Sequence, residues 1–168
     1  MRALSGTAGY AIQALAYLGT APHGKNQVHQ VHEIAARTGI PAAYLTKIFQ
    51  KLGTAGIVHS KRGRNGGIEL VRKPASVTLL EISNAIDGSQ ELDQCVLGLA
   101  RCGEERACPA HALWGKTRAH VRKILAKTTL TKVMKSKMVS GAVWNLEGVS
   151  SRAPCVPKGR SRRTRGKT

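Results

Sequence analysis

Three cysteines and one histidine lie close together in the sequence, and their side chains could bind a metal centre. Cys95, Cys102 and Cys108 follow the pattern Cys-x6-Cys-x5-Cys, and His111 stands three residues after the last of them. Thiolates and imidazoles are ligands for soft metals, and thiolates hold iron–sulfur clusters. A structural zinc site usually contains a close pair of cysteines, which this segment lacks. From the residues alone, an iron–sulfur cluster, zinc and redox-active thiols all remain open.

A helix predicted to begin near Pro109 would position the end of this group. The i, i+3 spacing places Cys108 and His111 on one side of its first turn, where unpaired backbone N–H groups and the helix dipole favour an anionic centre. A disulfide framework is not expected, and Cys155, far along the chain, is interpreted as a separate thiol. The other histidines have no ligand-like neighbours and are assigned to surface or loop positions: His23, His29, His32, His59 and His120.

The charge of the chain indicates a polyanionic partner. Of its 168 residues, 27 are basic and nine acidic, which gives a formal net charge of +18. Residues 37–73 hold eight basic side chains and one acidic one, Glu69, whereas five of the nine acids lie between Asp87 and Glu105. Side chains that only keep a surface soluble usually mix the two signs. The segregation therefore favours nucleic acid as the partner of the N-terminal half.

Hydrophobic periodicity predicts a mainly α fold with a small β-hairpin. Helices are expected over 5–19, ending at Gly19, and over 31–38 and 41–55, each followed by a glycine. Short strands are expected over 57–62 and 67–72 around the turn at 63–66. Thr78 and Glu81 form a capping-box pattern that opens a further helix ending at Gly88. Two short helices joined by a glycine-containing turn and followed by a basic hairpin are the parts of a winged helix-turn-helix.

Two segments are predicted to contact DNA. The exposed face of the helix over 41–55 offers short side chains for close approach to bases and cations for phosphates. The hairpin tip could place an arginine in a minor groove. The predicted contact residues are Ala42, Ala43, Tyr44, Thr46, Lys47 and Lys51 on the helix, and Ser60, Lys61, Arg62, Arg64 and Asn65 at the hairpin.

These segments resemble the IscR/NsrR/BadM family of winged-helix transcription regulators over about residues 1–135. The run Tyr44-Leu45-Thr46-Lys47-Ile48 is similar to the family's recognition helix. The run Ala55-Gly56-Ile57-Val58-His59-Ser60-Lys61-Arg62-Gly63, with Gly66-Gly67 after it, is similar to its wing. Members act as homodimers through the long C-terminal helix. The resemblance thus implies a dimer seam along Leu113, Trp114, Thr117, Val121, Ile124 and Leu125, unless this stripe only covers the chain's own core.

The resemblance also implies a cofactor. The run Cys108-Pro109-Ala110-His111-Ala112-Leu113-Trp114 matches the setting in which the IscR-like branch holds a 2Fe-2S cluster, with Cys95, Cys102, Cys108 and His111 as ligands. The first cysteine interval has six residues where that branch usually has five. A branch with a 4Fe-4S cluster sometimes uses an aspartate in the first helix, where this chain has Gly9. A 2Fe-2S cluster is therefore expected ahead of a 4Fe-4S cluster.

The expected organisation has four parts. Residues 1–88 form the winged helix-turn-helix, 89–108 the cysteine-rich loop, 109–147 the dimerisation helix and C-terminal segment, and 148–168 a disordered basic tail. No membrane-spanning or signal segment is predicted, so a cytoplasmic location is expected. An enzyme is not expected, because the sequence shows no glycine-rich nucleotide-binding loop, no nucleophile elbow and no paired carboxylates in a motif setting. A small zinc or thiol protein and a non-specific nucleic-acid-binding protein are the alternatives to a cluster-dependent regulator.

Overall fold

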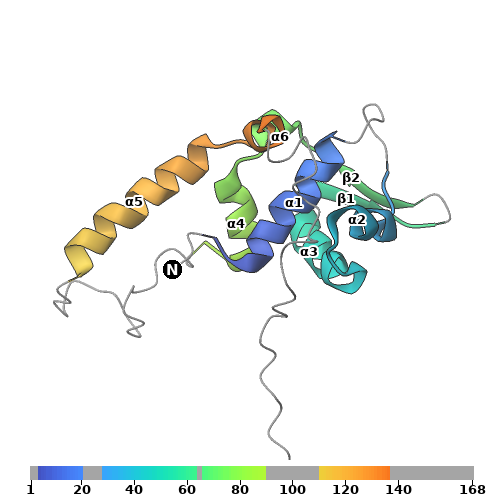
Figure 1. Cartoon of the computed structure of the whole chain (residues 1–168), viewed down its shortest axis with the longest axis horizontal. Helices are drawn as coiled ribbons and strands as arrows, with labels where there is room; N and C mark the ends of the chain where they lie inside the picture. The colour runs from blue at the N-terminus through green and yellow to red at the C-terminus, as the bar shows by residue number, and fades with distance from the viewer. Residues whose placement is uncertain (1–3, 21–27, 64–65, 90–109, 137–168) are drawn as a thin grey trace, which may run out of the picture.

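The computed structural model describes residues 4–20, 28–63, 66–89 and 110–136. Within them the chain is mainly helical, with one two-stranded antiparallel hairpin (Figure 1). The fold class expected from the sequence is confirmed. The elements in chain order are α1 (Gly6–Thr20), α2 (Val31–Thr38), α3 (Ala42–Thr54), β1 (Val58–Lys61), β2 (Gly67–Leu70), η1 (Pro74–Ser76), α4 (Leu79–Asp87), α5 (His111–Lys127) and α6 (Leu130–Lys135).

Helix α1 forms the centre of the core. Its alanines at positions 8, 11 and 14 are fully buried together with Leu15, and α1 packs against α2, α3, α4 and α6. The Ser5 hydroxyl accepts a hydrogen bond from the Ala8 N–H at 3.0 Å and so caps the helix. Because alanine side chains are short, the neighbouring helices can approach α1 closely.

Helices α2 and α3 form the helix-turn-helix at the predicted positions. Helix α2 ends where Gly39 adopts φ 69°, a left-handed conformation that glycine reaches without steric cost. Two residues later, the Pro41 carbonyl accepts hydrogen bonds from the N–H groups of Tyr44 and Leu45, which starts α3. Leu45 and Ile34 are buried and join the two helices to the core. The turn therefore sets α3 with its opposite face exposed.

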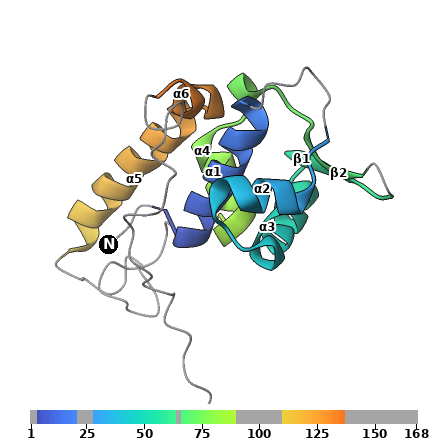
Figure 2. The ribbon, with the colours of Figure 1, turned by 45° about the vertical axis from the view of Figure 1, so that its right-hand side comes forward.

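The wing, defined as β1, β2 and their connection, pairs Val58 with Leu70 and Lys61 with Gly67. His29 extends it, because its N–H and carbonyl both bond to Ile68, at 2.9 and 2.8 Å. A Cβ atom at Gly67 would lie 2.4 Å from the His29 carbonyl oxygen, so this approach requires glycine. His29 lies in the connection between α1 and α2, as a loop position would, but it is buried and not on the surface; the other described histidines are exposed or half-buried. The hairpin extends outward beside α2 and α3 (Figure 2).

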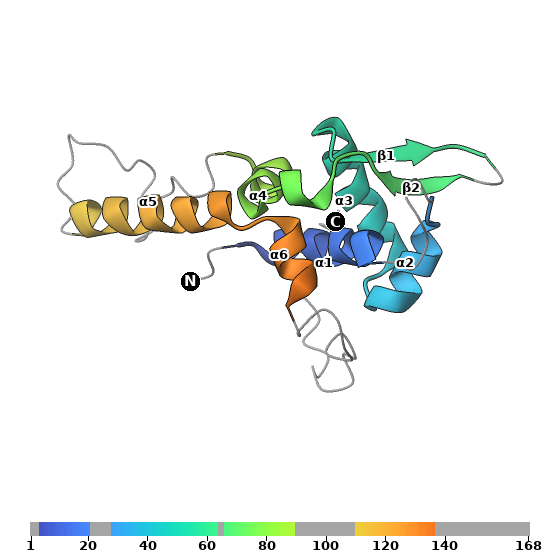
Figure 3. The same cartoon turned by 90° about the horizontal axis from the view of Figure 1, so that it is seen from above.

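The C-terminal helices pack on the core through a backbone bridge. The Leu79 N–H donates to the Thr128 carbonyl at 2.9 Å, and the Leu130 N–H donates to the Val77 carbonyl at 2.8 Å. This bridge interrupts the helix between α5 and α6, and Leu130 at the start of α6 is fully buried. From there α5 extends away from the body on the side opposite the wing (Figure 3). None of the described helices has the length and apolar character required to cross a membrane.

Candidate nucleic-acid interface and metal-ligand residues

The outer face of α3 carries small and polar side chains. Ala42, Ala43, Thr46 and Lys47 are all exposed. The Thr46 hydroxyl donates to the Ala42 carbonyl at 2.9 Å, which directs its proton into the helix and leaves its methyl group and lone pairs for a partner. The N-terminal half of α3 therefore exposes short side chains and one cation, Lys47.

Tyr44 lies on the same helix but is tied to α1. Its hydroxyl is 2.6 Å from the Thr7 hydroxyl, and its ring meets the Tyr10 ring edge-on with centroids 5.8 Å apart. Both residues remain partly exposed, Tyr44 at 36% and Tyr10 at 39%. Tyr44 therefore fixes the start of α3 against α1 while leaving part of its ring on the surface.

Lys51, the other predicted cation of α3, points toward α4. Its ammonium group donates to the Ile86 carbonyl at 2.6 Å, in the last turn of α4. A cation near a helix C-terminus interacts favourably with the helix dipole and with carbonyls that lack a partner inside the helix. The structure thus places Lys51 at the junction of α3 and α4, apart from Lys47.

The wing presents Ser60, Lys61 and Arg62 as exposed side chains. Lys61 forms an ion pair with Glu69 across the hairpin, with 3.1 Å between its ammonium nitrogen and a carboxylate oxygen. Its charge is therefore partly compensated. The Arg62 guanidinium makes no hydrogen bond or ion pair with the described residues. Arg64 and Asn65, predicted to contact DNA at the tip, lie outside the described residues.

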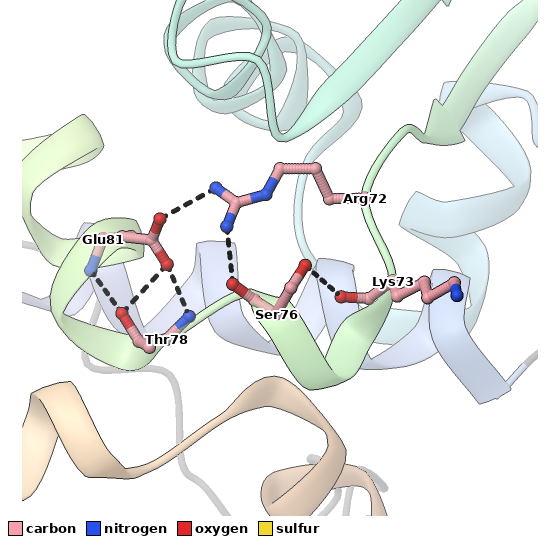
Figure 4. A network of polar contacts seen from close by, with 5 residues as sticks. All are labelled: Arg72, Lys73, Ser76, Thr78 and Glu81. Atoms are coloured by element: carbon pink, nitrogen blue, oxygen red, sulfur yellow. Dashed lines mark hydrogen bonds and ion pairs between the residues drawn. The ribbon is translucent and has the colours of Figure 1, made fainter.

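A polar network fixes the chain where it leaves the wing (Figure 4). Arg72, just after β2, donates to Glu81 at 2.8 Å and to the Ser76 carbonyl. Glu81 also accepts from the Thr78 N–H at 2.9 Å, while the Thr78 hydroxyl accepts from the Glu81 N–H at 3.2 Å. The predicted capping box is thus confirmed. Burial acts to raise the pKa of Glu81, but the bonds from Thr78 and Arg72 outweigh it and lower the pKa overall.

A second network, which was not predicted from the sequence, surrounds His29. The Tyr17 hydroxyl donates to Glu33 at 3.1 Å, and the His29 Nδ1 atom lies 3.6 Å from the same carboxylate oxygen. Burial acts to raise the pKa of Glu33, but Tyr17 and His29 outweigh it and lower the pKa overall. The residues come from α1, α2 and the segment paired to the wing, so only the folded chain brings them together.

Of the four predicted metal ligands, the structure describes His111 alone. It is the first residue of α5 and half-buried, two positions after the start expected at Pro109. Cys95, Cys102 and Cys108 lie outside the described residues, as does Cys155. Within the described ranges, no three His, Cys, Asp or Glu residues are grouped in a way that could hold a metal ion.

The family model of Rrf2, described as an iron-dependent transcriptional regulator, matches residues 4–136. The chain belongs to the Rrf2 family. It is 32% identical over 130 residues to the HTH-type transcriptional regulator IscR of Vibrio atlanticus, covering 77% of this chain and 73% of that one. It is 31% identical over 131 residues to IscR of Cereibacter sphaeroides, covering 77% of this chain and 84% of the relative. These relatives make this Rrf2 protein an IscR-like, DNA-binding transcriptional regulator and not an enzyme.

Solved structures agree with this assignment. The structure of T. potens IscR superposes on this Rrf2 protein with a TM-score of 0.61 at 26% identity, covering 79% of this chain and 85% of that chain. The match therefore extends beyond the winged helix-turn-helix. The sequence resemblance to the IscR-like regulators is confirmed.

Proposed function

We propose that this Rrf2 protein is a homodimeric regulator that binds promoter DNA sequence-specifically and whose affinity depends on an iron–sulfur cluster. One observation carries the DNA-binding part: α3 leaves small side chains and Lys47 exposed, and the wing that packs against it exposes Arg62. Short side chains let a helix approach the floor of the major groove, and a wing arginine suits a narrow minor groove. Lys47 and Arg62 would then contact phosphate and base edges from adjacent elements.

The donor set fits a cluster. Three thiols and one imidazole are soft ligands of the kind that hold iron and sulfide, and Cys95, Cys102, Cys108 and His111 would supply them. His111 is at the N-terminus of α5, where backbone N–H groups without helical partners favour negative charge. When bound, such a cluster supplies a redox-active centre whose charge changes with its state. We propose 2Fe-2S ahead of 4Fe-4S, because the Cys108 to Trp114 run matches the 2Fe-2S branch.

The chain's own contacts can link α5 to the DNA-binding elements. The C-terminal end of α5 is fixed to the start of α4 by the two backbone bonds between residues 77–79 and 128–130. The start of α4 is in turn held to the end of the wing by the bond from Arg72 to Glu81. A change in the orientation of α5 would therefore act on the base of the wing. Coupling of this kind requires two states with different affinity for DNA.

The test compares anaerobically purified full-length protein with Cys108→Ala and, as a matched control, Cys155→Ala. Iron, acid-labile sulfide and the visible absorption spectrum are measured, followed by binding to an operator selected from random duplexes. We expect wild type and Cys155→Ala to be coloured and to share one operator affinity. Cys108→Ala should be colourless and differ in operator affinity by about 5- to 150-fold, the usual range of coupling between two sites.

Three outcomes contradict the proposal. Full iron and sulfide content in Cys108→Ala removes the ligand assignment. A colourless wild-type protein that contains zinc assigns the cysteines to a structural metal site. Equal affinity for the selected operator and a scrambled duplex would show that the protein binds nucleic acid without sequence preference.

A further inference from the structure

The α5–α6 segment is strongly basic in a way that the winged helix-turn-helix does not explain. Residues 111–136 hold seven lysines and arginines and no aspartate or glutamate. Helix α6 packs against α1, and α5 extends on the side of the molecule opposite the wing (Figure 3). Its charge is thus spatially separate from Arg62 and the wing.

Three of these cations share one exposed sector of α5. Lys116, Lys123 and Lys127 are all exposed. At 3.6 residues per turn their side chains leave the helix within about 40° of one another, and at 1.5 Å per residue they extend over about 16 Å. We call these residues the lysine stripe.

The remaining basic residues of α5 face a different direction. Arg118 and Arg122 are half-buried on the sector that includes the buried Leu125. The Arg122 guanidinium donates to the Ser89 carbonyl at 3.3 Å, which ties it to the end of the α4 segment. The lysine stripe therefore contains the α5 cations that point into solvent.

Only Lys127, in the last turn of α5, is placed to stabilise this helix through its dipole. Lys123 and Lys127 are four residues apart on the helix surface, and like charges at this spacing destabilise a helix. The helix has no acidic residue that could compensate them, and a purely solvating face usually mixes signs. The next sector contains the exposed apolar residues Leu113 and Ile124, which suit a protein contact better than the lysines do.

We propose that the lysine stripe binds the phosphate backbone of duplex DNA outside the contacts made by α3 and the wing. The inference rests on the proposed DNA-binding function and extends it to a second surface. Each DNA strand carries one phosphate per 3.4 Å of axis, so a stripe of about 16 Å matches roughly five base pairs. Lysine acts as a mobile point charge, which suits phosphates and reads no base sequence. The stripe adds affinity and footprint length while base preference stays with α3 and the wing.

The test neutralises the stripe in the full-length protein as K116Q/K123Q/K127Q. The matched control is K73Q/K132Q/K135Q, which removes the same charge from exposed lysines off the stripe. Affinity is measured against salt on a long duplex with flanks around the operator, and on a short duplex limited to it. We expect the log–log salt slope on the long duplex to fall by about two to three units for the stripe variant, because each phosphate contact contributes about 0.9. The control should fall by less than one unit, and operator preference over a scrambled duplex should stay unchanged in both.

Equal slopes for the stripe variant and wild type overturn the inference, as does an equal fall in both triple variants, which would indicate net charge alone. If the stripe variant keeps the salt slope of DNA binding but loses binding to polyglutamate, the stripe binds an acidic protein. That result would also overturn the inference. Circular dichroism verifies that α5 stays helical in both variants. If wild type shows no operator preference, the proposed function fails. The salt slopes of wild type and the stripe variant can still be compared on any duplex.

Discussion

Tyr44, Lys47 and Lys51 occupy one helix, yet their side chains have different roles in the structure. The Lys51 ammonium is bound to the Ile86 carbonyl, and the Tyr44 hydroxyl is paired with Thr7. Lys47 is exposed, and its ammonium group makes no hydrogen bond or ion pair with the described part of the chain. Helical spacing alone predicts that all three side chains lie on the surface. It does not predict that Tyr44 bonds to α1 and Lys51 to α4. The contact surface proposed for α3 is therefore narrower than its exposed face.

Replacing Lys47 or Arg62 with alanine should weaken operator binding in different ways. Arg62→Ala should weaken operator binding and relax the preference for a narrow, A·T-rich minor groove, because an inserted arginine responds to the enhanced negative potential there. Lys47→Ala should lower affinity uniformly and reduce the salt slope by about one. Binding to the operator and to its single-base variants across a salt series measures both.

Lys51→Ala is the comparison on the same helix. It removes a bond to the end of α4, so we expect a lower melting temperature with little change in base preference. Unchanged affinity and base preference in both Lys47→Ala and Arg62→Ala would contradict the proposed docking of α3 and the wing.

At the scale of elements, local signals predicted most helices and strands, and contacts distant in sequence account for the rest. Gly39, Pro41 and the Thr78 capping box act within a few residues, and the elements beside them are found where expected. The His29 pairing with Ile68 and the break before α6 were not predicted. Both depend on backbone partners far along the chain, which periodicity cannot reveal. For the same reason, helical spacing predicts which side chains of α3 are exposed but not that Lys51 and Tyr44 bond to α4 and α1.

Replacing Glu81 with glutamine should remove a pH-dependent part of the stability. The pKa of Glu81 is lowered below its ordinary value of 4.5 in the folded protein. The ionised carboxylate therefore stabilises the fold fully above pH 4.5, and this contribution is lost as the pH falls through the lowered pKa. We expect Glu81→Gln to be less stable than wild type at pH 7, by about 0.3 to 1.5 kcal/mol for a capping interaction.

Urea unfolding of both proteins between pH 3 and pH 7 checks this prediction. The two free energies of unfolding should converge toward the acidic end of the range. A difference that is the same at pH 3 and pH 7 would show that the Glu81 charge does not contribute through the Thr78 and Arg72 bonds.

At the scale of the whole molecule, α5 leaves apolar surface uncovered. Leu113 is 72% exposed and Ile124 51% exposed, whereas Leu125 on the same helix is buried. Leu113 and Ile124, which were expected to belong to a dimer seam, are thus not buried against the chain's own core. A helix that extends from the body with exposed leucine and isoleucine suits a second copy of the chain, related by a two-fold axis.

A charged residue at an exposed apolar position of α5 should separate the proposed dimer. We expect Ile124→Asp to shift the full-length protein from dimer to monomer in sedimentation velocity, because an unpaired carboxylate would be buried in an apolar contact. Each monomer would then bind a single half-site, so affinity for a two-half-site operator should fall toward that for one half-site. Val71→Asp is the matched control, because Val71 is also an exposed apolar residue, at 60%, and lies just after the wing instead of on α5. It should remain dimeric. A dimer that persists in both Ile124→Asp and Leu113→Asp would place the subunit contact elsewhere on the protein, and a wild-type monomer at micromolar concentration would reject the homodimer.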